Sequence, residues 1–238
     1  IAYPIYSLAR ATSRVTGINR ILRRSLGPWV GRFIFKISEN KDTPLLIQGH
    51  KMFLAPPGRY PPLDMARNRY EPGTTRLFVS LLESNNVVID VGAHVGYYSL
   101  LAARQIGPNG KVYAFEPEAG NFHSLNRNVV LNGLTGKVMP YAIAFGDVCR
   151  VGRFYVSSTV PGSSQHSIDK EEIKGHRFSA QHIQGVAIFS LNDFVLESDI
   201  LFPNHIKIDV DGDGNADSAI IINNAFFNLT EDDFALGG

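Results

Sequence analysis

A run of residues near the middle of the chain has the types and spacing of a ligand-binding loop: Asp90-Val-Gly92-Ala-His94-Val-Gly96. An apolar strand pattern precedes it and a helical pattern follows it, so the run predicts a turn between a buried strand and a helix. Glycine lets the backbone approach a ligand closely, and the free amides of a helix N-terminus attract a carboxylate or phosphate. We therefore expect Asp90, Gly92, His94 and Gly96 to contact a ligand.

An acidic residue that suits a nucleoside ends the next strand pattern. Glu116 lies 20 positions after Gly96, where a carboxylate can accept hydrogen bonds from both hydroxyls of a ribose. The spacing Asp-x-Gly-x-His-x-Gly differs from the Gly-x-Gly-x-x-Gly fingerprint that accommodates a dinucleotide's pyrophosphate. The two sites together predict a nucleoside cofactor and favour adenosylmethionine over NAD. Glu116 could instead merely cap the following helix.

Alternating strand and helix patterns must position these residues. The sequence predicts helices over 74–82, 97–105 and 119–132, and strands over 87–91, 111–115, 137–145 and 205–210. Unbroken apolar strands that alternate with helices imply a parallel sheet covered by helices on both faces. We therefore predict an α/β fold with a doubly wound, mostly parallel sheet.

The first 62 residues differ from the rest in charge and pattern. Residues 1–50 carry eight Arg and Lys against two Asp and Glu, whereas the whole chain carries 23 against 22. The patterns predict two short amphipathic helices before residue 35, a hairpin over 44–54 and a Pro-rich linker. We expect a basic helical region at 1–62 and a compact domain at 63–238. The basic helices could be a solvated cap or a peripheral membrane contact.

Composition narrows the expected partners and location. The net charge of +1 gives no general attraction for nucleic acid. Cys149 is the only cysteine, which excludes an intrachain disulfide and a cysteine-based zinc site. No apolar run is long enough to span a bilayer. We therefore expect a cytoplasmic protein without a nucleic-acid partner.

An irregular segment interrupts the pattern over 152–190. A short strand over 153–156 precedes a stretch rich in Ser, Gly and Pro and then a charged stretch at 169–174. Long insertions in compact domains are commonly functional or mobile. We expect this insertion to form a lid over the substrate.

Several motifs together resemble those of the FkbM family of methyltransferases over roughly residues 70–212. They are Tyr70-Glu-Pro72 with Thr75, then 88–99, 107–117, Leu125-Asn-Arg-Asn128, Leu131-Asn-Gly133 and 206–212. The resemblance implies a Rossmann-like class I methyltransferase fold and methyl transfer from adenosylmethionine, typically to a hydroxyl of a sugar, lipid or polyketide-like acceptor. It also implies that Glu71 and Thr75 close over the methionine end of the cofactor, although Glu71 could simply cap the next helix.

Three features depart from the family's pattern. His94 stands where Asn is usual, and it is bulkier but can still donate one hydrogen bond. The usual Asp-x-Glu-Gly-x-Glu reads Asp209-Val-Asp211-Gly-Asp213-Gly214 here, which keeps an acidic pair with one shorter side chain. Only 27 residues follow Asp211. This is too few for the three further strands that such folds normally contain. We therefore expect the fold to be truncated or altered at its C-terminal end.

The acidic pair could activate the methyl acceptor. Methyl transfer from a sulfonium is an in-line displacement, so the protein must align the reacting atoms and remove the acceptor's proton. Asp209 and Asp211 lie two apart at a strand's carboxyl end, hence on one face. One could act as the base and the other orient it, or both could hold Mg²⁺ and acidify the acceptor hydroxyl. They could also be solvated turn residues.

Two other functions are compatible with this end of the chain. Asp209-Val-Asp211-Gly-Asp213-Gly-Asn-Ala-Asp217 matches an EF-hand-type calcium loop at several positions, but Ile220 occupies position twelve and an apolar strand precedes the loop. The shortened end also fits a Rossmann-like domain that has lost catalysis. Cofactor binding without turnover would identify this second alternative.

Overall fold

The computed structural model describes residues 44–53, 65, 70–159, 166–173 and 175–208, and the backbone of 219–222. The predicted basic helices, the Pro-rich linker, Asp209, Asp211 and the remainder of the calcium-like loop up to residue 218 lie outside these residues. Within the described ranges, no helix combines the length and the apolar composition that crossing a bilayer requires.

A five-stranded sheet in the order β13-β12-β3-β4-β5 forms the centre of the described structure. The parallel strands are β12 (His205–Ile208), β3 (Val87–Val91), β4 (Lys111–Phe115) and β5 (Val138–Tyr141), and β13 (Ala219–Ile222) pairs antiparallel with β12. Numbered by their order along the chain, β3, β4, β5 and β12 are the first to fourth parallel strands. Their order across the sheet is therefore 3-2-1-4, as in the Rossmann fold. This order reverses between β3 and β12, and ligands of open α/β sheets bind outside the carboxyl ends at such a reversal.

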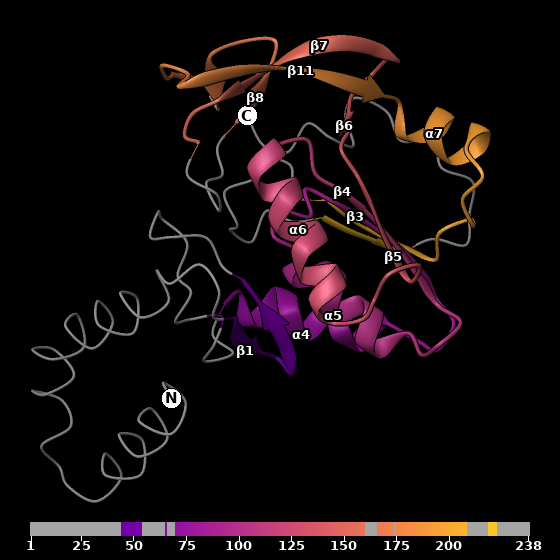
Figure 1. The fold of residues 1–238 in the computed structure, drawn as a ribbon. Helices are drawn as coiled ribbons and strands as arrows, with labels where there is room; N and C mark the ends of the chain where they lie inside the picture. Colours follow the sequence, from indigo (N-terminus) through magenta and orange to yellow (C-terminus); the bar gives the residue numbers. More distant parts are fainter. Residues whose placement is uncertain are drawn as a thin grey trace, which may run out of the picture.

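Helices cover both faces of this sheet (Figure 1). On one face, α4 (Pro72–Leu81), α5 (Tyr97–Gln105) and α6 (Ala119–Leu131) bury Phe78, Leu100 and Leu125 against Val88 and Val112. On the other face, α7 (Leu191–Glu197) buries its apolar side chains against Val87, Ile89, Tyr113 and Phe115. Both faces of each central strand are therefore buried, which explains the unbroken apolar runs. The predicted doubly wound α/β fold is confirmed.

The predicted strand over 137–145 is wrong in its extent. β5 ends at Tyr141, and the separate strand β6 (Ala144–Phe145) pairs with a strand of another sheet. Pro140 lies in β5, which is the edge strand of the central sheet and can tolerate a residue that lacks an N–H donor. The chain thus leaves the central sheet in the middle of one apolar run.

The insertion and the preceding strand β6 form a second sheet in the order β6-β11-β7-β8. Its long strands β7 (Arg150–Val156) and β11 (His182–Phe189) pair antiparallel, β8 (Ser167–Ile168) adds to β7, and β9 (Glu172–Ile173) and β10 (His176–Arg177) form a small hairpin. Phe154, Val156, Val186 and Ile188 give this sheet its own core. The expected irregular segment is therefore largely regular, while its role as a lid stays a prediction.

The predicted N-terminal hairpin is present as β1 (Leu45–Ile47) and β2 (His50–Met52). Gln48 and Gly49 turn with φ of 49° and 85°, the positive pair that two-residue hairpins favour. Arg104 of α5 donates to the Gln48 carbonyl at 2.7 Å. Ile47 and Met52 belong to the same core as α5 and α6. The hairpin thus packs on the central domain, and the boundary expected at residue 63 stays a prediction.

Candidate functional site

The Gly92–Gly96 loop connects the carboxyl end of β3 to α5. Gly92 and Ala93 donate their amides to the Phe115 carbonyl at 3.0 and 2.9 Å, which fixes the loop to the end of β4. Gly92, His94 and Gly96 have φ of 71°, 54° and 95°. The φ of 95° at Gly96 strains any residue with a Cβ, and a Cβ there would also lie 2.8 Å from the Leu125 side chain, so this position favours glycine. The left-handed conformation of His94 also explains why Asn, which tolerates it better, is usual there.

Glu116 is joined directly to this loop. Its side chain is buried, with Oε2 accepting the His94 amide at 2.8 Å and Oε1 accepting the Glu118 amide at 2.9 Å. Glu116 is not the helix cap, because Glu118 occupies that position and accepts the amides of Gly120 and Asn121. Burial, with a smaller contribution from nearby Glu118, raises the pKa of the Glu116 carboxyl to about 7.

The loop and Glu116 together fit a nucleoside cofactor. Each Glu116 oxygen accepts one backbone N–H, and the Asn121 side chain also hydrogen-bonds this carboxylate. An ionised carboxylate has about four lone-pair sites, so it retains capacity for a further donor such as a ribose hydroxyl. Gly96 is the N-cap residue of α5 and provides no side-chain cap, so the first amides of this helix can face a ligand carboxylate. Both features lie at the carboxyl ends of neighbouring parallel strands.

Asp90 is buried at the end of β3, where its carboxylate contacts other side chains of the protein. Its Oδ2 accepts a hydrogen bond from the Ser99 hydroxyl at 2.6 Å, and its Oδ1 is 3.4 Å from the Lys207 ammonium. Lys207 is the register partner of Asp90 across β12 and β3. The second contact is an ion pair by distance but lacks the geometry of a hydrogen bond. Asp90 thus connects β3, β12 and the first turn of α5, and its contact with a ligand stays a prediction.

Glu71 and Thr75 meet at Tyr98. The Tyr98 hydroxyl donates to Glu71 Oε2 at 2.5 Å and lies 3.4 Å from the Thr75 hydroxyl oxygen. Glu71 occupies the N-cap position of α4, but its side chain makes no capping hydrogen bond. The Lys207 ammonium lies 4.9 Å from the Tyr98 ring centroid. Burial and the bond to Glu71 raise the pKa of Tyr98, which keeps its hydroxyl a proton donor.

The predicted residues therefore form two adjacent groups. One contains the glycine loop and Glu116, and the other contains Asp90, Glu71 and Thr75; the first turn of α5 connects them. The sequence motifs do not identify Ser99, Tyr98 and Lys207 as site residues. A lysine within an apolar strand was an available signal for Lys207, since a buried ammonium requires a partner.

The proposed catalytic aspartates lie just beyond the described end of β12. Ile208 ends this strand beside β3 at the reversal of strand order, so the chain continues toward Asp209 from the edge where ligands bind. Ile220, position twelve of the calcium-like loop, lies in strand β13, which is unlike the helix that follows an EF-hand loop. Among the described residues, no group of three His, Cys, Asp or Glu could hold a metal ion.

The sequence also matches a known protein family. The family model described as the methyltransferase FkbM domain matches residues 90–213, more than half of the 238 residues. This range begins at Asp90 and includes the glycine loop, Glu116, the second sheet and β12. No curated protein matches the chain.

The chain is also similar over part of its length to solved structures of methyltransferases. The chain is similar to a putative rRNA methylase from Clostridium thermocellum (15% identity, 31% of this chain and 39% of that chain, TM-score 0.30). It is also similar to an SAM-dependent O-methyltransferase from Thermotoga maritima (25% identity, 30% of this chain and 28% of that chain, TM-score 0.28). A third similar structure is M. jannaschii TYW2 in complex with AdoMet (25% identity, 39% of this chain and 39% of that chain, TM-score 0.31). The chain spans 28–39% of these three proteins, and likenesses of this extent do not bear on its function.

Proposed function

This chain belongs to the methyltransferase FkbM domain family, and we propose that it binds S-adenosylmethionine and transfers its methyl group to an acceptor hydroxyl. The observation that carries the proposal is the hydrogen bond between the His94 amide and Glu116. It joins a loop built for close backbone approach to a carboxylate that suits a ribose, across the carboxyl ends of β3 and β4. Neither part alone identifies a nucleoside site, whereas the two parts joined at one end of the sheet are specific for one.

Each part of the site has a distinct role in this proposal. Adenosylmethionine supplies a methyl group made electrophilic by its sulfonium. Glu116 accepts the ribose hydroxyls, and the amides at the start of α5 bind the carboxylate of the methionine moiety. Glu71 and Thr75, which both contact Tyr98, would close over the methionine end of the cofactor, as the family resemblance implies. The buried surroundings of Glu116 and Asp90 exclude water and strengthen these polar contacts.

The acceptor is a hydroxyl of a sugar, lipid or polyketide-like molecule, as the family resemblance implies. Asp209 and Asp211 follow β12 at the reversal of strand order, and this position supports one of them as the base that removes the acceptor's proton. In the alternative, both aspartates hold Mg²⁺, and activity would then require an added divalent cation. Turnover of Asp209→Asn and Asp211→Asn variants with and without Mg²⁺ separates the two versions.

Titration calorimetry with adenosylhomocysteine tests the cofactor assignment. Glu116→Ala should weaken binding by roughly 1 to 3 kcal/mol, because the charge-assisted bonds to the ribose are lost. Glu197→Ala, which removes an exposed carboxylate at the end of α7, is the matched control and should leave affinity unchanged. Equal affinities in the two variants would show that Glu116 does not bind the nucleoside. Binding without turnover would instead indicate a domain that has lost catalysis.

A further inference from the structure

Asn128 of α6 joins three segments of the chain through one buried side chain. Its Oδ1 accepts the Phe53 amide at 2.7 Å, and its Nδ2 donates to the carbonyls of Phe53 and Val95 at 3.2 and 2.8 Å. Asn128 is 0% exposed. Both amide hydrogens are therefore used, one on the residue after β2 and the other inside the cofactor loop.

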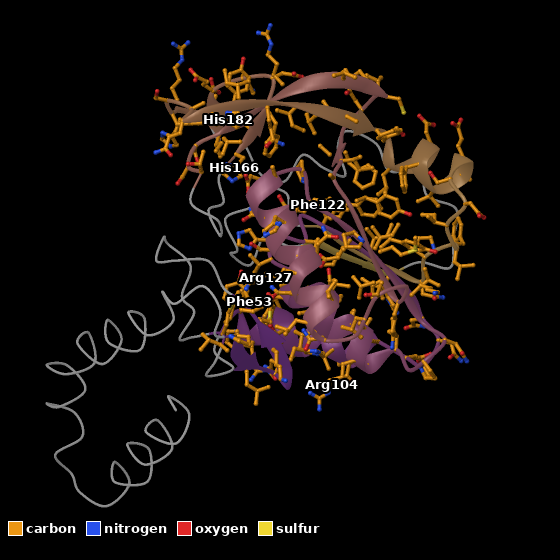
Figure 2. The ribbon with its side chains drawn as sticks, in the orientation of Figure 1. Phe53, Arg104, Phe122, Arg127, His166 and His182 are labelled. Atoms are coloured by element: carbon orange, nitrogen blue, oxygen red, sulfur yellow. The ribbon has the colours of Figure 1, made fainter. Side chains whose placement is uncertain are left out.

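Asn132, one helical turn later, binds the same hairpin but not the loop. Its Oδ1 accepts the Lys51 amide at 2.9 Å, and its Nδ2 donates to the Lys51 carbonyl at 2.7 Å. The two asparagines lie on one face of α6, and the alternate residues Lys51 and Phe53 present their backbone groups on one edge of the hairpin. The side-chain amides thus take the place of a third strand. Figure 2 shows Phe53 beside Arg127, whose guanidinium carbon lies 3.4 Å from the ring centroid.

The contact with Val95 fixes one peptide group of the loop at both ends. The Val95 carbonyl accepts from Asn128, and the Gly96 amide of the same peptide group donates to the Ala93 carbonyl at 2.8 Å. Val95 is buried, so its carbonyl would lack a partner if Asn128 lost its amide. The orientation of this peptide group sets where α5 begins and where its first free amides point.

We propose that Asn128 is a positioning residue for the cofactor loop and that it couples the loop to the docked hairpin. The inference rests on the proposed function for its ligand, but its structural part concerns the loop alone. Without the Asn128 amide, the Val95–Gly96 peptide group gains freedom to rotate, and the amides that follow it lose their common direction. Cofactor affinity then falls because Asn128 acts through the Val95 carbonyl of the loop and not through a contact of its own with the cofactor.

The comparison of Asn128→Ala with Asn132→Ala tests this role. Both variants lose two hydrogen bonds to the hairpin, so both should melt at a lower temperature than the parent chain. Only Asn128→Ala should weaken adenosylhomocysteine binding, by about tenfold, and raise the hydrogen-exchange rates of the Ala93 and Gly96 amides by a similar factor. Asn132→Ala should leave both quantities at the values of the parent chain.

Equal loop exchange rates in the two variants would overturn the proposal, because Asn128 would then act only as a hairpin anchor. Should Asn128→Ala not fold, Asn128→Ser and Asn132→Ser are compared in the same way. Failure of the parent chain to bind adenosylhomocysteine would reject the proposed function, whereas the exchange rates decide the role of Asn128 independently of any ligand.

Discussion

Glu116 combines deep burial with a position where a charge is needed for binding. Its pKa of about 7 means that the carboxyl group is partly protonated at neutral pH. The ionised form accepts hydrogen bonds from ribose hydroxyls, and the protonated form accepts them less well. Cofactor binding should therefore favour the ionised form and lower its pKa, since binding and deprotonation are linked.

We accordingly expect adenosylhomocysteine affinity to fall as pH decreases through the Glu116 pKa of about 7. Calorimetry between about pH 8 and about pH 6 should show an affinity decrease of up to about tenfold, one pKa unit corresponding to about 1.4 kcal/mol. In a Glu116→Gln variant, affinity should be weak and nearly independent of pH over this range. A parent-like pH dependence in this variant would assign the titration to another group.

His50 is a second residue for which protonation and structure are linked. It is buried in β2, and burial together with the charge of Arg104 lowers its pKa below the ordinary 6.5. The unfolded chain therefore binds a proton at a pH where the folded chain does not. Stability from this group is present above pH 6.5 and is lost as pH falls below that value.

His50→Leu should therefore reduce the loss of thermal stability on acidification. Melting temperatures at about pH 7.5 and about pH 5.5 measure the effect. His176→Leu, at an exposed position in β10, is the control and should keep the parent pH dependence. An identical decrease in all three proteins would show that the pH dependence arises elsewhere; His205, whose pKa burial also lowers, is then the next residue to test.

Among the secondary-structure elements, β12 and β3 are joined by a buried charge pair. Lys207 and Asp90 are both nearly inaccessible to solvent, and their charged groups are 3.4 Å apart. Removing one member leaves the other charge buried without compensation, at a cost of about 3 to 5 kcal/mol. Replacing both with neutral residues of similar size avoids this cost.

Lys207→Met should consequently destabilise the chain by about 3 to 5 kcal/mol in urea unfolding, whereas the double variant Asp90→Asn with Lys207→Met should recover part of that loss. Lys170→Met, at an exposed position, is the control and should change stability by less than about 0.5 kcal/mol. Additive losses in the double variant would mean that the two charges do not interact.

The elements that could be predicted are those in which the spacing of apolar residues clearly indicates either a strand or a helix. β3, α5 and β4 begin and end where the sequence pattern places them, because two apolar strands and a largely buried helix follow one another without a break. The division of β5 from β6 and the pairing of β7 with β11 depend on partners distant in sequence, which a local pattern does not contain. For the same reason, the glycine loop and Glu116 could be found from sequence, but the contacts of Lys207 and Asn128 could not.

For the whole molecule, the hairpin contacts define how much of the N-terminal part the cofactor site needs. Residues 44–53 contact α5, α6 and, through Asn128, the loop. Deleting residues 1–43 should leave adenosylhomocysteine affinity and cooperative melting unchanged, whereas deleting residues 1–53 should reduce both. Calorimetry and thermal melting of the two shortened chains measure this. Loss of cooperative melting in the shorter deletion would show that the preceding basic region is also part of the fold.

A glutamine of the second sheet hydrogen-bonds the chain next to Glu116. Gln184 of β11 donates from Nε2 to the Pro117 carbonyl at 2.5 Å. Its Oε1 accepts a hydrogen bond from the Ala119 amide at 3.4 Å. Pro117 directly follows Glu116, and Ala119 is the first residue of α6. A molecule that moves β11 on binding therefore also displaces the ribose-binding segment. Thermodynamic reciprocity then requires the cofactor to change the affinity for that molecule by the same factor, so the hydrogen bonds of a single glutamine would carry the coupling between the two binding events.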